Sequence, residues 1–397
     1  MYRFSTPFGD LDLTRYPQEP REQLRAWDAA DDYLLRHLAE KAPAAGGTTV
    51  VLGDRWGALT TALTTAPATA LAGREPVQVS DSYLGQQATR ENLRRIGAQD
   101  RARLLSTRES RGAQAPERID LLLVRVPKSL ALLEDQLHAL APAVHRDTVV
   151  VGTGMVSEIH TSTLALFERI LGPTVTSLAV RKARLIFCTP DPDLARAANP
   201  WPLRYALPDG IGPMSGRTVT NHAGVFCADR LDVGTRLLLA NLPQRQGPDR
   251  VIDLGCGNGV VGTAAALANP ASDVLFTDES HQAVASAEAT FRDNADPATA
   301  AEFLVADAAA GVPAGSADLV LNNPPFHSHR ATSDSSARRM FATARAALRP
   351  GGELWVVGNR HLGYHVRLRR LFGNCEVVAS DPRFVVLRAV RRAPRAR

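Results

Sequence analysis

Residues 251–259 read VIDLGCGNG, and they constrain the fold of this 397-residue chain more than any other segment. The apolar run at the start is typical of a short buried strand, and the small residues at 258–267 are typical of a helix. Between them, glycines at every second position let the backbone turn sharply and pass close to a ligand without a Cβ clash. The segment therefore predicts a strand–turn–helix unit of an α/β domain, with a ligand site at the turn.

Strands and helices are predicted to alternate through the rest of the C-terminal half. The expected strands are 274–277, 303–305, 319–321 and 354–357, and the expected helices are 281–294, 337–348 and 365–372. Such alternation predicts a Rossmann-like α/β fold, with a doubly wound and mostly parallel sheet. Two closing strands, at 376–379 and 384–390, predict an antiparallel last strand.

The N-terminal half repeats this order, which predicts an internal duplication. Its expected strands are 49–52, 77–79, 121–126, 148–151, 174–179 and 183–187. Prolines at 200, 202 and 208 concentrate between the halves, as they do in linkers. We therefore expect two tandem domains of the same fold, at 1–195 and 216–397, joined by a linker at 196–215.

The two copies differ at the positions that matter for a ligand. The turn LGCGNG at 254–259 aligns with LGDRWG at 52–57, so that Arg55 replaces the middle glycine. A bulky side chain there blocks close approach of a ligand to the backbone. In the same way, NPPF at 323–326 aligns with VPKS at 126–129, which lacks the asparagine and the aromatic residue. We expect a working C-terminal copy and a degenerate N-terminal copy.

Acidic residues follow three successive strands of the C-terminal half: Asp253, Asp278 and Asp307. Ligands of such sheets bind at the carboxyl ends of the strands. The charge of Asp253 disfavours a phosphate and favours a cationic sulfonium with its ammonium group. Asp278 is placed to accept two ribose hydroxyls, and Asp307 to lie near an adenine amine. The alternatives are that Asp278 caps the next helix and that Asp307 caps a turn.

This pattern predicts S-adenosylmethionine as the cofactor. Cys256 is expected to be a small buried residue within the turn. The predicted cofactor-binding residues are Asp253, Gly255, Cys256, Gly257, Asn258, Gly259, Asp278, Asp307 and Asn323.

The segment NPPF follows the fourth strand and can hold a planar amine. The lone pair of an exocyclic aromatic or amide nitrogen is delocalised, so that the nitrogen is a poor nucleophile. The Asn323 side-chain oxygen and the Pro324 carbonyl can accept its hydrogen bonds and direct the lone pair at a methyl group for in-line transfer. Phe326 can stack on the face of a base. The predicted catalytic residues are Asn323, Pro324, Pro325 and Phe326; the alternative is a rigid turn.

The cysteines, the histidines, the apolar runs and the net charge exclude several classes of protein. The four cysteines form no CxxC motif, and His327 and His329 have no acids or cysteines around them, so that neither a disulfide framework nor a metal site is expected. No apolar run reaches membrane-spanning length. The net charge of +5 is compatible with a nucleic-acid partner. We expect a soluble cytoplasmic protein, and a monomer.

In these residues the chain resembles the ribosomal RNA guanine-N2 methyltransferases of bacteria, over almost its full length. The resemblance implies two class I methyltransferase domains, with a degenerate N-terminal one that recognises RNA. It also implies S-adenosylmethionine-dependent N2-methylation of one guanine in 23S ribosomal RNA. The segments that carry it are 26–31, 81–84, 88–93, 126–133, 159–163, 221–223, 278–280 and 358–362.

Three alternatives differ in substrate or class. The first is guanine-N2 methylation of 16S ribosomal RNA, and the second is N5-methylation of a protein glutamine, which also uses Asn-Pro-Pro with an aromatic residue. The third is a non-catalytic RNA-binding protein, against which the intact acids and the intact NPPF argue. RNA is favoured over protein by the inactive N-terminal copy, where the arginines Arg94, Arg95, Arg101, Arg103, Arg108 and Arg111 concentrate positive charge. The basic C-terminal segment 388–397 is expected to be a solvated end, with contact to phosphates as the alternative.

Overall fold

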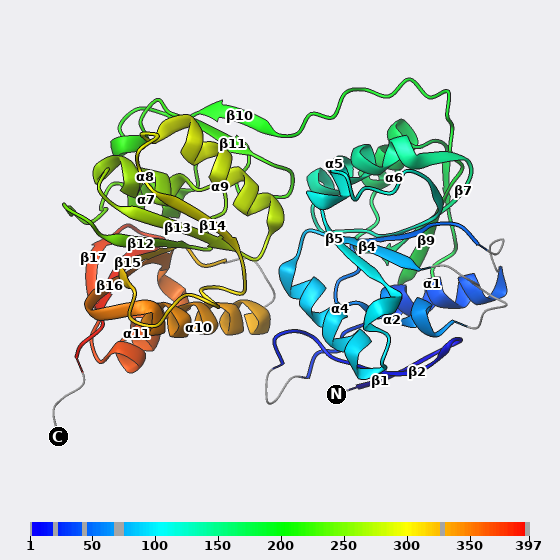
Figure 1. Ribbon diagram of the computed structural model, residues 1–397, viewed down its shortest axis with the longest axis horizontal. Helices are drawn as coiled ribbons and strands as arrows, with labels where there is room; N and C mark the ends of the chain where they lie inside the picture. The colour runs from blue at the N-terminus through cyan, green and yellow to red at the C-terminus, as the bar shows by residue number, and fades with distance from the viewer. Residues whose placement is uncertain (1, 19–22, 42–45, 67–74, 326–329, 394–397) are drawn as a thin grey trace. The chain divides into compact units, whose positions relative to one another are not determined.

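The computed structural model describes residues 2–18, 23–41, 46–66, 75–325 and 330–393. The chain forms two compact units, Met1–Pro200 and Trp201–Arg397 (Figure 1). Each unit contains a seven-stranded sheet of its own, with helices on both faces. The predicted α/β class and the two tandem sheets are therefore confirmed.

The sheet of the C-terminal unit has the strand order β14-β13-β12-β15-β16-β18-β17. Its first five strands are parallel, and β18 runs antiparallel to both of its neighbours. The predicted antiparallel last strand is thus confirmed. The bounds are β12 Arg250–Leu254, β13 Asp273–Asp278, β14 Ala301–Val305, β15 Ala317–Asn322, β16 Leu348–Asn359, β17 Glu376–Ser380 and β18 Phe384–Val390.

The helices of this unit cover both faces of the sheet, which explains why its central strands are mostly apolar. Successive residues of β12 show the alternation: Val251 packs in the core on the α8 side, and Ile252 packs in the core on the α10 side. The helices are α7 Val233–Leu239, α8 Val260–Ala268, α9 His281–Asn294, α10 Arg330–Ala347 and α11 Tyr364–Phe372.

The N-terminal unit has the equivalent strand order, β5-β4-β3-β6-β7-β9-β8, which confirms the duplication. Its strands are β3 Thr49–Leu52, β4 Pro76–Ser80, β5 Arg103–Ser106, β6 Ile119–Arg125, β7 Val144–Met155, β8 Thr174–Thr176 and β9 Ala183–Cys188. Its helices are α1 Ala29–Glu40, α2 Ala58–Thr65, α4 Tyr83–Arg95, α5 Leu130–Leu140 and α6 Thr161–Ile170.

Two hairpins lie outside the large sheets. One pairs β1, Tyr2–Thr6, with β2, Gly9–Leu13, and packs Phe4 into the core next to α1 and α2. The other pairs β10, Leu203–Ala206, with β11, Thr218–Asn221. The strand β10 lies within residues 196–215, where the sequence predicts a linker. None of the described helices is both long enough and apolar enough to span a membrane.

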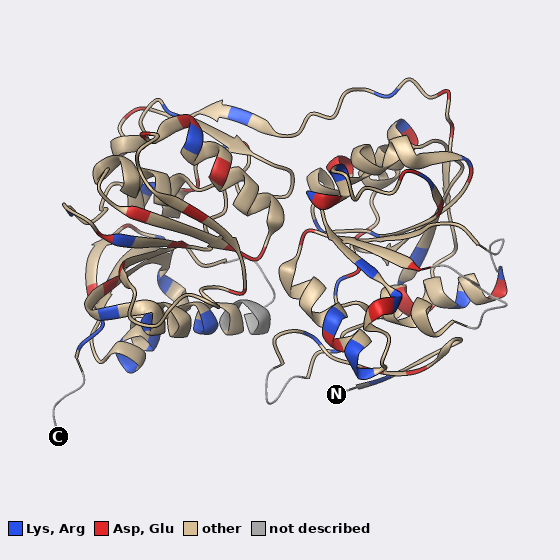
Figure 2. Cartoon of the chain, in the orientation of Figure 1, with Lys and Arg blue, Asp and Glu red and all other residues tan. Residues whose placement is uncertain are grey.

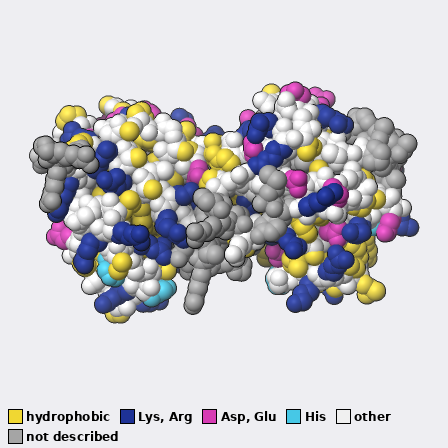
Figure 3. All heavy atoms as spheres, turned by 90° about the horizontal axis from the view of Figure 1, so that it is seen from below, with side chains coloured by type: hydrophobic (Ala, Val, Ile, Leu, Met, Phe, Trp, Pro, Cys, Tyr) yellow, Lys and Arg dark blue, Asp and Glu magenta, His cyan; other side chains and the backbone are white. Residues whose placement is uncertain are grey.

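Basic and acidic residues are distributed over both units (Figure 2). In the N-terminal unit, Arg94 and Arg95 both pair with Glu91 of the same helix. In the C-terminal unit, α10 and α11 form one side, where basic side chains gather with few acidic ones between them (left half of Figure 3). The exposed cations that make no ion pair with a described residue there include Arg345, Arg369 and Arg370.

Candidate active site

The turn between β12 and α8 uses its three glycines for two purposes. Gly255, Gly257 and Gly259 all have positive φ, at 71°, 53° and 75°. A Cβ on Gly255 would lie 2.6 Å from Met340 Cε, and one on Gly259 would lie 2.6 Å from Ala287 Cα. A Cβ on Gly257 would meet no atom within 4 Å. The outer glycines therefore permit close packing, while Gly257 leaves open space beside the backbone.

Asp278, the last residue of β13, holds this turn against the strand end. One carboxylate oxygen accepts a hydrogen bond from the Gly257 N–H at 3.0 Å, and the other accepts one from the Ser280 N–H at 3.0 Å. Burial raises the pKa of Asp278, and these N–H groups oppose the shift. The N-cap of α9 is Ser280, so Asp278 is left facing the turn.

Asp253 lies under the turn and is 3% exposed. Its carboxyl accepts a hydrogen bond from the Gly262 N–H at 2.7 Å, in the first turn of α8. Burial raises the pKa of Asp253 to about 8, against the effect of that N–H. Near neutral pH the group is therefore mainly a neutral carboxylic acid, and a direct contact with a sulfonium stays a prediction. Cys256 is buried in the core on the α8 side.

Two further predicted cofactor-binding residues, Asp307 and Asn258, each have a protein partner. Asp307 forms an ion pair with Arg339 of α10, at 3.3 Å. The Asn258 side chain donates a hydrogen bond to Asn221 Oδ1 at 3.0 Å, so that β11 supports the turn. The sequence pattern did not assign Asn221 to the site, because its partner lies 37 residues away in the chain.

The end of β15 presents two side-chain oxygens without donors. Asn322 is fully buried, and its Nδ2 donates to the Leu254 carbonyl at 2.6 Å. Asn323 Nδ2 donates to Thr235 Oγ1 at 2.9 Å and lies 3.4 Å from Asp232 Oδ2. The Oδ1 atoms of both asparagines are buried and accept no hydrogen bond from a described residue.

The two prolines that follow differ in exposure. Pro324 is buried and Pro325 is exposed. Phe326, His327 and His329 lie outside the described residues. The structure therefore brings the glycine turn and two free amide acceptors to the carboxyl ends of adjacent parallel strands, where such sheets bind ligands. Buried acceptors without a donor are rare in proteins, and a bound group with N–H donors would satisfy these two.

The N-terminal unit can be compared residue by residue through its strand pairing. Leu52 pairs with Val124 as Leu254 pairs with Asn322, so that Arg125 occupies the position of Asn323. The predicted alignment of 323–326 with 126–129 is therefore wrong by one residue. An alignment on Pro127 and Pro324 is displaced by one residue from the strand ends, where Arg125 matches Asn323.

Charged groups fill the equivalent site in the N-terminal unit. Arg125 is completely buried and pairs with Asp28 at 2.6 Å, Glu158 at 2.9 Å and Asp31 at 3.3 Å. Arg55, at the position of Gly257, pairs with Glu158 at 2.6 Å and Asp28 at 3.5 Å. Burial acts to raise the pKa of Glu158, but the two arginines outweigh it and hold the pKa at about 2.

The acids of the C-terminal site are also missing from this copy. Through the strand pairing, Val51, Ser80 and Arg108 take the places of Asp253, Asp278 and Asp307. The cluster of Arg55 and Arg125 with their acids thus stands where the C-terminal unit has its open turn and its free acceptor. Both observations agree with an N-terminal copy that no longer holds the ligand.

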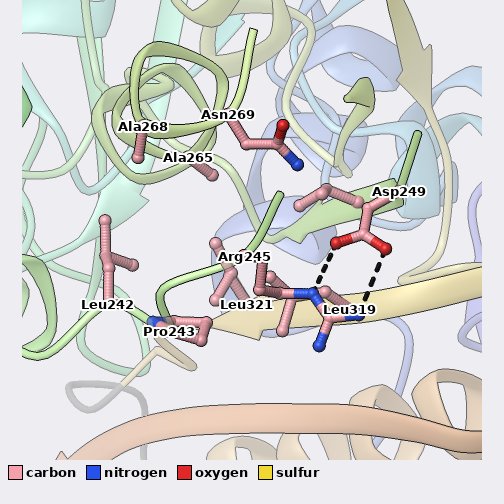
Figure 4. A pocket seen from close by; sticks show the side chains of 10 residues that line it. Leu242, Pro243, Arg245, Asp249, Ala265, Ala268, Asn269, Leu319 and Leu321 are labelled. Carbon is pink, nitrogen blue, oxygen red and sulfur yellow. Dashed lines mark hydrogen bonds and ion pairs between the residues drawn. The ribbon is translucent and has the colours of Figure 1, made fainter. Parts of the chain in front are cut away.

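A pocket in the C-terminal unit lies at the opposite end of the sheet (Figure 4). Asp249, Val251 and Leu319 line it at the amino-terminal ends of β12 and β15. An ion pair between Arg245 and Asp249 closes one wall, at 2.5 Å. Because the glycine turn lies at the other strand ends, this pocket is separate from the site. Among the described residues, no group of three or more His, Cys, Asp or Glu side chains is placed to hold a metal ion.

The chain is similar to proteins of known name. Residues 1–192 match the model of the RLMG N-terminal domain, and residues 216–388 match that of the methyltransferase small domain. A relative from Streptomyces avermitilis named ribosomal RNA large subunit methyltransferase G is 67% identical, over 98% of this chain and 99% of its own. A relative of the same name from Aeromonas salmonicida is 45% identical, over 96% and 97%.

Among solved structures, the chain resembles a 16S rRNA N2 G1207 methyltransferase, RsmC, of T. thermophilus, in complex with AdoMet and guanosine. The TM-score is 0.72, the identity is 22%, and 98% of each chain is covered. At this identity the likeness shows the fold, and both of its units are included.

Proposed function

The chain belongs to the ribosomal RNA large subunit methyltransferase G family, and from this we propose that it transfers a methyl group from S-adenosylmethionine to the N2 amine of one guanine in 23S ribosomal RNA. Relatives that share this name match nearly the whole chain, including both units. The N-terminal unit is proposed to recognise the RNA, and the C-terminal unit to carry out the transfer.

One observation carries the proposal: the buried Oδ1 of Asn323, one residue beyond the end of β15, accepts no hydrogen bond from any residue that the structure describes. An exocyclic amine is a suitable partner, because it offers two N–H groups in one plane. The Pro324 carbonyl can accept the second of them, and a proline contributes no N–H of its own. The strand end therefore presents acceptors to an amine.

The residues here act chiefly by orientation. Hydrogen bonds to both N–H groups of the amine align its lone pair with the approaching carbon, and holding the reactants in line can supply a large part of the rate enhancement. S-adenosylmethionine supplies a methyl group on a positively charged sulfur, which is reactive toward a weak nucleophile. The described residues near Asn323 need not include a strong base, since the proton can leave after the nitrogen has become cationic.

The glycine turn suits the methyl donor. The open space beside Gly257 admits a ligand to the backbone, and Asp278 lies directly next to it. The Asp278 carboxylate accepts hydrogen bonds from the N–H groups of Gly257, Ser280 and Glu279. Its two oxygens offer about four lone-pair sites, so that the group can still accept from a ribose hydroxyl. We propose the same residues as cofactor ligands that the sequence pattern predicts, with Asn221 as a support for Asn258.

The charge of the C-terminal unit supports a nucleic-acid substrate. Arg345, Arg369 and Arg370 are exposed on α10 and α11 without an ion-pair partner among the described residues. Free guanidinium groups of this kind bind phosphates, and they account for the salt dependence of such complexes. The N-terminal pairs of Arg94 and Arg95 with Glu91 reduce the net charge available there.

The experiment that tests this function is transfer of labelled methyl from S-adenosylmethionine to 23S rRNA, 16S rRNA and assembled subunits, followed by nucleoside analysis. The expected product is N2-methylguanosine in 23S rRNA or in the large subunit. Product in 16S rRNA alone would assign the chain a small-subunit substrate. Label in protein and in no RNA would favour the glutamine alternative.

A further inference from the structure

We propose that Asp232 and Thr235 are positioning residues, which fix the Asn323 amide so that its oxygen faces the substrate amine. The inference rests on the proposed function, because it assigns a role in that reaction. It concerns the start of α7, a helix that contains neither the glycine turn nor the NPPF segment. The first observation is that three polar groups meet at this helix end.

The contacts form a short chain of hydrogen bonds. Asp232 is the N-cap of α7, and its Oδ2 accepts the Thr235 N–H at 2.8 Å. The Thr235 hydroxyl lies 3.2 Å from the same oxygen. Asn323 Nδ2 lies 2.9 Å from Thr235 Oγ1 and 3.4 Å from Asp232 Oδ2. These contacts join the strand end to the helix cap.

Only one arrangement of hydrogen atoms satisfies this chain. A carboxylate can only accept, so the Thr235 hydroxyl must donate its hydrogen to Asp232. The lone pairs of that hydroxyl are then left for a donor, which must be the Nδ2 group of Asn323. If the amide were rotated by half a turn, its oxygen would face the Asp232 oxygen and repel it. The helix cap therefore turns Nδ2 inward and Oδ1 outward.

The free atom lies on the far side of the amide from the cap. Asn323 Oδ1 is buried and has no donor among the described residues, although Nδ2 has two acceptors within 3.4 Å. An asparagine whose donor end is held and whose acceptor end is empty is prepared to receive an N–H group. This polarity is the one that the exocyclic amine of guanine requires.

The N-terminal unit shows the same junction with different chemistry. Asp28 caps α1 as Asp232 caps α7, and Asp31 takes the third helical position, as Thr235 does. Both acids contact Arg125, which occupies the position of Asn323, at 2.6 and 3.3 Å. A cation there is matched by two acids, and an amide by one acid and one hydroxyl. The cap thus suits the residue that it holds in each copy.

The test replaces the hydroxyl of Thr235 without changing the shape of the side chain. Thr235→Val removes the acceptor, and the amide can then rotate and present Nδ2 to the amine. We expect kcat to fall on the order of 100-fold, as for misplaced reacting groups, with the Kd for S-adenosylmethionine within about twofold of wild type. Thr235→Ser keeps the hydroxyl and should restore kcat.

Thr299→Val is the matched control. Thr299 is a buried threonine of the same unit whose hydroxyl donates to the Pro270 carbonyl at 3.3 Å, away from the strand ends that carry the site. It should lose stability and keep kcat. Asp232→Asn is a second test variant. An asparagine at this position still caps the helix, but its side chain has a donor NH2 group in place of one of the two acceptor oxygens. It should lower kcat in the full-length enzyme while Kd for the cofactor stays unchanged.

Three results would overturn the inference. The first is wild-type kcat in Thr235→Val. The second is a loss of kcat that Thr235→Ser does not restore, and the third is a loss of kcat that parallels a loss of cofactor affinity, because either would mean a structural role. Failure of the proposed function looks different: the wild-type enzyme itself would then bind S-adenosylmethionine and form no N2-methylguanosine.

Discussion

Arg125 and Asn323 occupy the same position in their two units: each is the first residue beyond the last pair between the glycine-turn strand and its neighbour. In one unit the position holds a buried guanidinium with three acids around it. In the other it holds an amide whose oxygen accepts no hydrogen bond from the described part of the chain. The residue at this one register position thus distinguishes a filled site from an open one, in two sheets with the same strand order.

Replacement of Asn323 by alanine should remove methyl transfer and leave cofactor binding largely intact. The side chain supplies the acceptor for the amine, and loss of one positioned polar group in an active site costs on the order of 10²–10³ in kcat. Single-turnover transfer to the RNA substrate measures the first effect, and calorimetric titration with S-adenosylmethionine measures the second. A variant that loses cofactor affinity as well would assign Asn323 a structural role.

Gly257→Arg should abolish cofactor binding, because it puts into the open turn the residue type that the N-terminal copy has there. The matched control is Gly315→Arg. Both glycines have positive φ, at 53° and 72°, and a Cβ on either would meet no atom within 4 Å. The backbone strain is therefore similar, at about 1–2 kcal/mol. If titration shows that both variants bind S-adenosylmethionine equally well, the turn is not its site.

Stability of the cofactor-free protein should respond to pH through Asp253. Its folded pKa of about 8 lies above the ordinary value of 3.8. An acid with a raised pKa stabilises the fold at low pH, and this contribution is lost as pH rises from about 4 to about 8. Asp253→Asn, which keeps the acceptor for the Gly262 N–H, should therefore gain stability relative to wild type as pH rises.

The expected gain is up to about 1.4 kcal/mol per pH unit. Urea unfolding of both proteins at pH 5, 6, 7 and 8 measures the difference in unfolding free energy. A difference that stays constant over this range would show that Asp253 is ionised in the folded protein throughout.

The arginines of α10 and α11 should contribute to RNA affinity. Replacement of Arg345, Arg369 and Arg370 by glutamine removes three unpaired charges, so the slope of log K against log salt should fall by about 2, at roughly 0.7 per phosphate contact. Binding of the rRNA substrate at several salt concentrations measures it. The double variant of Arg204 and Arg292 is the control, since these exposed arginines of the same unit pair with Asp293 and Glu288. An equal loss in the control would mean that α10 and α11 have no special role in binding RNA.

Local patterns predicted the parts of the fold that neighbouring residues determine. The apolar run into three glycines identified β12 and its turn, and alternation identified the other strands of the C-terminal sheet. The strand β5, Arg103–Ser106, was missed because it is a short edge strand with an arginine at its exposed start. Its existence depends on pairing with β4, which no short sequence window contains.

The site was predicted less completely than the fold, for a related reason. Asn323 and Asp278 could be chosen because each follows a strand directly. The contact of Asn323 with Thr235 joins residues 88 positions apart, and the sequence around Thr235 reads as an ordinary helix start. The orientation of Asp253 toward α8 and the partner of Asp307 on α10 also depend on packing between elements. The assignments of these residues as cofactor ligands stay predictions.

The position of β18 determines how much of the chain must be made before the C-terminal sheet can be completed. In the C-terminal sheet β18, Phe384–Val390, lies between β16 and β17, and β17 pairs with no other strand of that sheet. The N-terminal sheet has all of its strands by Cys188. During synthesis the first sheet can therefore close while the second still waits for its final strand. A chain that stops before residue 384 has a complete first half and a catalytic sheet without its β18 strand, so we expect it to transfer no methyl group.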